Sequence, residues 1–183
     1  MKSLILYLRL LSFLPQKRAN YSLFFTCILF VSLSGHAYPT KDLKKVGQGT
    51  MSWMFIDIYD AEFFTSNGKY KPNQFPQVLT ITYLKDIKQK RLIDATKEQW
   101  VLQGQNSESV KRWIAILSDI WPDIQQGDKL TFYVEQNKKG TFFHNGQAIG
   151  HIKEQAFSMA FLSIWLSEKT SQPELRQQLL GVQ

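Results

Sequence analysis

Residues 141–181 read TFFHNGQAIGHIKEQAFSMAFLSIWLSEKTSQPELRQQLLG, and much of the fold can be inferred from them. Asn145-Gly146 lies between two short apolar runs, which is typical of a two-residue β-hairpin turn. Residues 156–166 are apolar almost all round a helical projection. This pattern predicts a buried helix rather than an amphipathic surface helix.

The end of this stretch predicts one more helix. Ser171 and Glu174 have the spacing of a capping box, in which each side chain accepts a hydrogen bond from the backbone N–H of the other residue. The helix is expected to finish at the Leu-Leu-Gly of residues 179–181, because glycine is common just after a helix. A hairpin followed by two helices is therefore expected here.

Two strands are predicted upstream. Residues 51–64 are rich in aromatic and β-branched side chains and predict one long strand, with Ser-Asn-Gly at 66–68 as its turn. It is apolar on both faces, so both faces are expected to be covered at least in part. Residues 76–84 alternate large apolar residues with threonines, which predicts a second strand with one buried face and one wetter face.

Helical spacing begins near Ile87 and stops at Gly104. A second helix follows, with Asn106 or Ser107 as its N-cap and Pro122 beyond its end. Residues 130–134 and 141–144 then predict strands on either side of a turn at 137–140. The order β-β-α-α-β-β-β-α-α, with strands joined through hairpins and helices in pairs, predicts an α+β fold with a mainly antiparallel sheet.

The first 37 residues resemble an export signal. Lys17 and Arg18 precede an apolar run at 21–33, and Gly35 and Ala37 are small residues at the −3 and −1 positions of a cleavage site. The run is shorter than the roughly 20 residues that span a bilayer. We therefore expect residues 1–37 to be a signal peptide cleaved after Ala37, residues 38–183 to form the domain, and the protein to be periplasmic. An uncleaved anchor is the alternative.

Cysteine usage and charge exclude several function classes. Cys27 is the single cysteine and lies in the predicted signal, so a mature chain without it has no disulfide, zinc-thiolate site or cysteine nucleophile. Four of the 22 Lys and Arg residues, and none of the 15 Asp and Glu residues, lie in the first 37 residues. The remainder is close to balanced, so a nucleic-acid partner is not expected.

We expect neither a metal nor a cofactor. His144 and His151 are the histidines of the predicted mature chain, and a two-residue turn at Asn145-Gly146 pairs His144 with Gln147 rather than with His151. The sequence also lacks a P-loop, a dinucleotide fingerprint, a zinc motif and a G-x-S-x-G motif.

Two polar features have alternative interpretations. Asp57 interrupts an apolar strand face, so it is either a buried carboxylate that marks a site or a surface residue beside water. The cations of residues 85–91 either form a solvated helix face or recruit an anionic head group such as a fatty-acid carboxylate. These cations are Lys85, Lys88, Lys90 and Arg91.

Taken in order, several weak motifs resemble the chalcone isomerase-like family, and in particular its bacterial exported branch. They are a glycine pair at 47 and 49, Tyr59-x-Ala61, Gly127-Asp128, Asn145-Gly146, Gly150 and Ile164-Trp165-Leu166. The resemblance covers nearly all of residues 38–183. It implies an open-faced β-sandwich, in which a large antiparallel sheet carries a layer of helices on one face.

The resemblance also implies what the chain does not do. Catalytic members use an arginine and a threonine, whose positions fall near Met51 and Met54 here. Methionine cannot donate a hydrogen bond to a developing anion, so an active chalcone isomerase is not expected.

Non-catalytic relatives hold fatty acids between the sheet and the helices, so a small apolar or amphipathic ligand is expected in that cleft. The cleft candidates are Met54, Ile56, Ile58, Tyr83, Phe157 and Phe161. Two alternatives remain. One is an isomerase or lyase on another substrate that uses Asp57, Tyr59 or Tyr83, and the other is an interaction module for an envelope protein.

Overall fold

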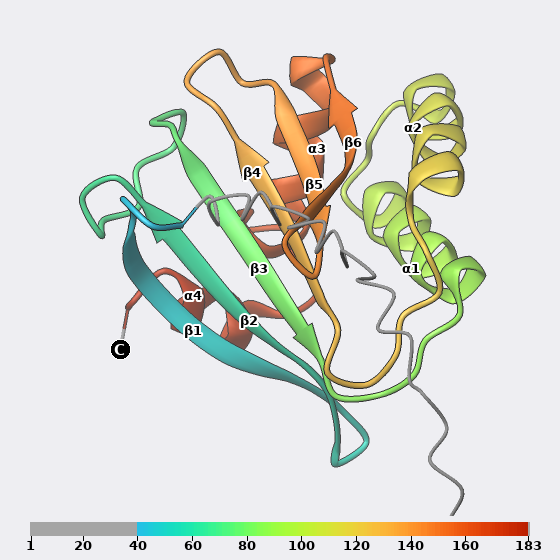
Figure 1. Cartoon of the computed structure of the whole chain (residues 1–183), viewed down its shortest axis with the longest axis horizontal. Coiled ribbons are helices and arrows are strands. Elements are labelled where there is room, and N and C mark those ends of the chain that lie inside the picture. The colour runs from blue at the N-terminus through green and yellow to red at the C-terminus, as the bar shows by residue number, and fades with distance from the viewer. Residues whose placement is uncertain (1–39, 183) are drawn as a thin grey trace, which may run out of the picture. The chain divides into compact units, whose positions relative to one another are not determined.

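A computed structural model of the chain describes residues 40–182, and within them the chain forms six strands and four helices (Figure 1). The strands are β1 (Lys44–Trp53), β2 (Ile56–Thr65), β3 (Gln77–Tyr83), β4 (Lys129–Val134), β5 (Gly140–His144) and β6 (Gln147–Ile152). The helices are α1 (Gln89–Leu102), α2 (Ser107–Ile120), α3 (Gln155–Leu166) and α4 (Pro173–Leu179). None of these helices is both long and apolar enough to cross a membrane.

The strands form one sheet in the order β1-β2-β3-β4-β5-β6, and every neighbouring pair is antiparallel. α1 and α2 lie between β3 and β4 in the chain, and α3 and α4 follow β6. α3 and α4 pass behind the sheet in the view of Figure 1, with α1 beside α3 and α2 packed on α1. The predicted α+β open-faced architecture is confirmed.

The prediction of one strand at residues 51–64 is wrong. β1 ends at Trp53, Met54 and Phe55 form the turn, and β2 begins at Ile56. The two turn residues themselves are Met and Phe, and neither favours a turn. The turn is imposed by the ladder between β1 and β2, which continues to the pair Lys44–Thr65 at the other end.

The other end signals give a mixed outcome. Asn145 and Gly146 form the β5–β6 turn with φ of 50° and 83°, which confirms that prediction. Asn106 caps α2, since its side chain accepts from two backbone N–H groups. The capping box at Ser171 is wrong, because the N-cap of α4 is Gln172 and makes no side-chain cap bond.

β3 is buried more completely than its alternation predicts. It lies inside the sheet, and its threonines are not all wet: Thr80 is buried opposite Thr131 on β4. Their hydroxyl oxygens lie 3.1 Å apart, so the two polar groups satisfy each other. The wetter face expected for this strand is therefore wrong at Thr80.

Aromatic rings fill the interface between β4, β5 and α3. Phe132 and Phe142 stack on neighbouring strands with their centroids 4.3 Å apart, and Phe157 of α3 contacts both edge-on. Trp100 of α1 and Trp113 of α2 extend the cluster and lie 5.2 Å apart. Offset and edge-to-face contacts of this kind are the favoured arrangements of aromatic pairs.

The glycine pair of β1 lets the last helix lie against the first strand. A Cβ at Gly47 would overlap the backbone oxygen of Gln178 on α4, and one at Gly49 would overlap the Gln178 side chain. The glycines are thus needed for close approach rather than for an unusual φ. α4 thereby packs on the face of β1 at this side of the sheet.

Candidate functional site

A cavity of about 230 Å³ lies between the sheet and the helices, at the end of the sheet nearer the β1–β2 turn. The sheet contributes Met51, Ile58, Tyr59, Ile81, Tyr83 and Leu130. The helices contribute Arg91, Leu92, Thr96, Phe161, Ile164 and Trp165. Hydrocarbon and aromatic surface makes up most of the wall, so the cavity suits an apolar group.

Polar groups are gathered on one side of the cavity. Gln99 of α1 and Ser171 of the α3–α4 connection both line it, and the Ser171 hydroxyl donates to Gln99 Oε1 at 2.8 Å. Both side chains are at least partly exposed. This side therefore faces water, whereas the sheet side is dry.

Two tyrosines give the dry side its polar atoms. The ring centroids of Tyr59 and Tyr83 lie 6.0 Å apart in an edge-to-face arrangement. Trp165 Nε1 donates to the Tyr59 hydroxyl at 3.0 Å, whereas the Tyr83 hydroxyl has no partner among residues 40–182. Burial raises the pKa of Tyr59 to about 12, and burial together with Tyr59 raises that of Tyr83 as well. Both phenols are therefore neutral hydrogen-bond donors at ordinary pH.

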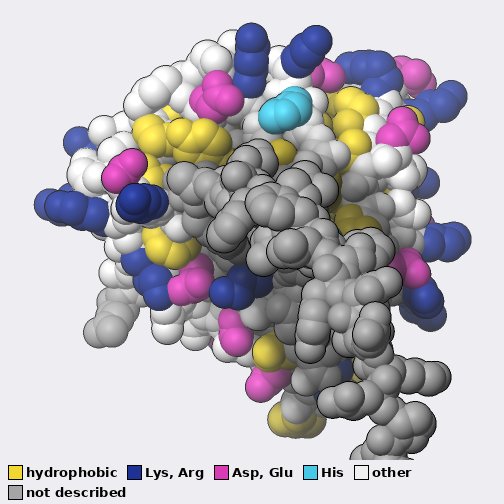
Figure 2. Space-filling view, viewed as in Figure 1, with side chains coloured by type: hydrophobic (Ala, Val, Ile, Leu, Met, Phe, Trp, Pro, Cys, Tyr) yellow, Lys and Arg dark blue, Asp and Glu magenta, His cyan; other side chains and the backbone are white. Residues whose placement is uncertain are grey.

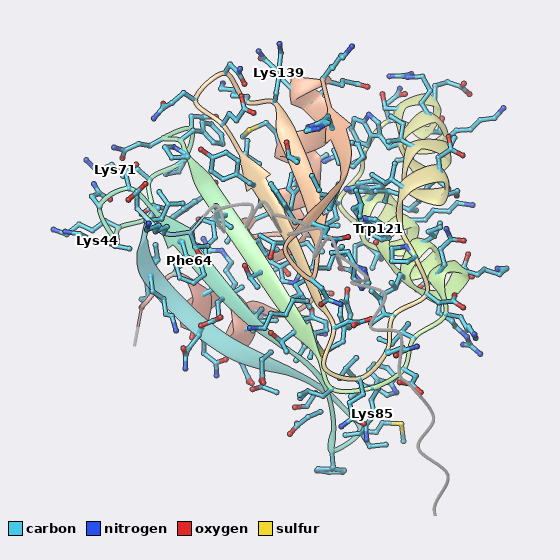
Figure 3. The ribbon with its side chains drawn as sticks, in the orientation of Figure 1. Lys44, Phe64, Lys71, Lys85, Trp121 and Lys139 are labelled. Carbon is cyan, nitrogen blue, oxygen red and sulfur yellow. The ribbon has the colours of Figure 1, made fainter. Side chains whose placement is uncertain are left out.

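Trp121, which follows α2, also lines the cavity and is buried (Figure 3). Its indole N–H has no acceptor among the described residues. A buried donor without an acceptor is uncommon in folded proteins, and it favours a polar atom or water arriving beside it.

Arg91 is the cation that lines the cavity. Its neighbours in the basic cluster are neutralised: Lys88 Nζ lies 2.8 Å from Asp123, and Lys90 Nζ lies 2.7 Å from Asp94. Arg91 has no ion pair among residues 40–182 and is exposed on α1. It is therefore available to an anion at the entrance of the cavity.

Comparison with known proteins identifies the family of this chain. Residues 36–181 match the chalcone isomerase-like family. The chain belongs to that family. An uncharacterized protein of Haemophilus influenzae is 29% identical over 161 residues, which is 87% of this chain and 77% of that protein.

The fold of this chalcone isomerase-like domain has a solved counterpart. A fatty-acid binding protein of Arabidopsis thaliana superposes with a TM-score of 0.58 and 13% identity, covering 76% of this chain and 87% of the other. At that identity the likeness concerns the fold.

The chalcone isomerase-like domain brings three of the six predicted cleft residues together. Ile58, Tyr83 and Phe161 line the cavity. Phe157 lies instead in the aromatic cluster and is fully buried. Met54 and Ile56 are exposed at the β1–β2 turn, because the predicted strand is in fact a hairpin.

The cavity also holds residues that sequence reasoning did not select. Met51, which the family resemblance placed at a catalytic position, lines the wall from β1, whereas Met54 does not reach it. The sequence pattern indicates Trp165 only as part of a buried helix. Tyr59 is a candidate from sequence only for the alternative isomerase or lyase chemistry, and the structure places it in the cavity wall. Its position two residues before the buried Ala61 on the same strand face was the available signal.

The remaining polar candidates lie elsewhere. Asp57 is exposed and accepts from the Ser52 hydroxyl at 2.6 Å, so the surface interpretation is correct. His144 lies 3.1 Å from Asp128, and His151 bonds to Thr141. Residues 40–182 contain no cluster of three metal-ligating side chains.

Proposed function

We propose that this chalcone isomerase-like domain binds a small amphipathic ligand of the fatty-acid type and does not transform it. The observation that carries the proposal is an apolar cavity with a single cation, Arg91, beside its polar entrance. An apolar chain would lie against Ile58, Phe161 and their neighbours, and an anionic end group would face Arg91. The fold it shares with a fatty-acid binding protein supports this assignment.

The size of the cavity limits the ligand. Sites for drug-sized molecules are usually about 300–1,000 Å³, and this cavity measures about 230 Å³. The proposed ligand therefore has a short apolar chain, or a longer chain of which part lies outside the entrance. The Tyr83 hydroxyl and the Trp121 indole could donate hydrogen bonds to a polar atom in the apolar part of the ligand.

The cavity lacks the groups that an acid–base catalyst needs. Its ionisable lining residues, among those that the structure describes, are Arg91, Tyr59 and Tyr83. With a pKa of about 12, Tyr59 does not act as a base near neutral pH, and Tyr83 is shifted in the same direction. Asp57, the carboxylate considered for an isomerase or lyase, lies outside the cavity. Binding is thus favoured over catalysis.

The test compares matched ligands and matched variants. Calorimetric titration with carboxylates from hexanoate to palmitate is expected to show binding, with weaker binding of the corresponding alcohols. Arg91→Gln should weaken carboxylate binding about tenfold while sparing the alcohols, because only the charged hydrogen bond is lost. Lys85→Gln removes a nearby cation that does not line the cavity, and it should change neither. Absence of binding by any of these ligands would refute the proposal.

We further propose that the domain acts outside the cytoplasm, after cleavage at Ala37. The basic pair, the apolar run and the small residues before that point support export. The predicted signal lies outside the described residues. Intact-mass measurement of the protein recovered from a periplasmic extract is expected to give a chain that begins at Tyr38. A mass that retains residues 1–37 would favour the uncleaved anchor.

A further inference from the structure

The turn between β1 and β2 carries four consecutive large apolar side chains into solvent. Trp53 is 62% exposed, Met54 75%, Phe55 106% and Ile56 51%. Figure 1 shows this turn projecting below the rest of the sheet, and Figure 2 shows hydrophobic side chains at the same lower end. We call residues 53–56 the tip. Scattered exposed hydrophobic residues are ordinary, but a contiguous apolar projection usually marks a contact.

Folding does not account for the composition of the tip. Met54 and Phe55 have φ of 47° and 67°, in the left-handed region that glycine and asparagine prefer. A two-residue turn of this kind favours Asn-Gly, which the β5–β6 turn of the same sheet has. Bulky apolar residues at these two positions strain the backbone and bury nothing in return. Folding of residues 40–182 therefore does not explain why these two positions carry large apolar side chains.

We propose that the tip inserts into the interfacial layer of a lipid bilayer. The next pair along the hairpin is polar: the Ser52 hydroxyl donates to Asp57 at 2.6 Å. One strand residue on each side, Trp53 or Ile56, separates that pair from the turn. The two residue steps from the pair to the turn span about 7 Å at a rise of roughly 3.3 Å per residue. Interfacial segments bury their apolar side about 5–10 Å deep. The apolar part of the hairpin therefore ends at the depth where head groups and water begin.

The chemistry of the tip favours lipid over a protein partner. None of its side chains has an oxygen, and the Trp53 indole is its single side-chain hydrogen-bond donor, so the tip offers little for specific recognition. Trp is enriched where membranes meet water, because its ring is apolar and its N–H is polar. Aromatic side chains present roughly 150–250 Å² each, so four partly exposed side chains fall short of the about 800 Å² per partner of a standard interface.

The surroundings of the tip have balanced charge. Lys85 follows Leu84, whose backbone N–H donates to the Ile58 carbonyl at 2.9 Å, and it has no ion pair among residues 40–182. The acidic Asp57 belongs to the polar pair itself. Insertion is therefore expected to depend mainly on the apolar side chains, with similar binding to zwitterionic and anionic vesicles.

The tip is also continuous with the cavity along both strands. Met51 and Ile58 line the cavity, and each lies two residues from the tip. An inserted tip would hold the cavity next to the membrane, where an amphipathic ligand accumulates. Insertion itself does not depend on the proposed ligand, because it rests on the tip alone.

Trp53 provides a direct reporter of insertion. It is the exposed tryptophan of the five, since Trp100, Trp113, Trp121 and Trp165 are all buried. The full chain is mixed with phosphatidylcholine vesicles whose acyl chains carry bromine, with and without phosphatidylglycerol. We expect quenching of tryptophan emission in both vesicle types and loss of that quenching in Trp53→Phe.

A pair of substitutions then tests the energetics. Phe55→Asp should lower the vesicle partition coefficient, measured from Trp53 quenching, at least tenfold, because it places a charge in the apolar layer. Val101→Asp changes an equally apolar exposed residue on α1 and should leave the coefficient unchanged. Circular dichroism confirms that both variants fold.

Two outcomes would overturn the proposal. One is the absence of vesicle binding. The other is binding without quenching of Trp53, which would mean that another segment, such as residues 1–37, makes the contact.

Discussion

The two ends of the interface between sheet and helices differ in how they are filled. At one end, Phe132, Phe142 and Phe157 occupy the space between β4, β5 and α3 ring against ring. At the other end, Tyr59 and Tyr83 face a hollow of about 230 Å³. The same sheet and the same helix contribute to both ends. The difference teaches that the fold itself requires dense packing at one end only.

Phe161 forms the boundary between the two ends. Its ring lies 4.9 Å from that of Phe132 on the filled side, and its other side lines the cavity. The filled end stabilises the domain through apolar burial. At the hollow end the unpaired Trp121 indole borders the cavity. At the filled end the Trp113 indole also has no acceptor among the described residues, but aromatic rings enclose it. Dense packing and the hollow thus lie at separate ends of one interface.

The largest expected effect is at the filled end. Phe157→Ala should lower the free energy of unfolding by about 3–5 kcal/mol, because a fully buried ring is removed from close packing. Urea denaturation measures the loss. Gln155→Ala, an exposed change on the same helix, should stay within about 0.5 kcal/mol. A loss below about 1 kcal/mol for Phe157→Ala would show that this end is not densely packed.

The next effect is alkaline destabilisation from the hollow end. Burial raises the pKa of Tyr59 to about 12 in the folded chain, compared with the ordinary value of 10.0 for a tyrosine in the unfolded chain. Its stabilising contribution is complete below pH 10 and is lost as the pH rises toward 12, because the unfolded chain releases the proton first. The loss amounts to at most about 3 kcal/mol at about 1.4 kcal/mol per pH unit.

Urea midpoints measured on either side of pH 10.0 should show this decline. Tyr59→Phe should make it shallower. An unchanged slope in that variant would assign the alkaline loss to other groups.

A smaller effect separates the two tyrosines. Tyr59→Phe removes the acceptor of Trp165 Nε1 and should cost about 1–3 kcal/mol, because a buried donor is left without a partner. Tyr83→Phe removes a hydroxyl without a partner among residues 40–182, so it should cost less than about 0.5 kcal/mol or even stabilise the ligand-free domain. Thermal denaturation of both variants measures the difference. Equal costs would contradict this distinction.

The smallest effect concerns ligand preference. Phe161→Leu trims the wall between the two ends and should shift binding toward longer carboxylates by a few-fold, since a methylene in an apolar pocket is worth only about 1 kcal/mol. Phe157→Leu makes the same chemical change behind that wall and should leave the preference unchanged. Competition titrations with carboxylates of increasing length compare the two variants. A shift in both would mean that the ends are not separate.

The filled end was more predictable from sequence than the hollow one. The apolar periodicity of residues 156–166 and the Asn145-Gly146 turn correctly predict α3 and the β5–β6 hairpin. Such patterns report burial, and burial is what α3 and the strands beneath it share. Periodicity cannot say which buried side chains meet an opposing ring and which meet a hollow, because that depends on side chains from distant segments.

The errors have the same origin. Met54 and Ile56 were assigned to the cleft because their segment has the composition of a strand, and composition gave no sign of the turn. Arg91 was predicted within a basic cluster. It differs from Lys88 and Lys90 because those two form ion pairs with Asp123 and Asp94. Asp123 lies 35 residues from Lys88 in the sequence, so that pair cannot be inferred locally. Only tertiary structure shows that Arg91 is both without an ion pair among residues 40–182 and at the cavity.

The contact between Gly47 and Gln178 has a consequence for the order of events during synthesis. β1 is the first strand of the domain to leave the ribosome, and α4 is the last element. Domains tend to fold as units while they emerge, but here the covering of β1 must wait until nearly the whole domain has been made. During that interval the face of β1 that carries Gly47 and Gly49 stays uncovered. Chaperones that bind the nascent chain would encounter the domain in this unfinished state.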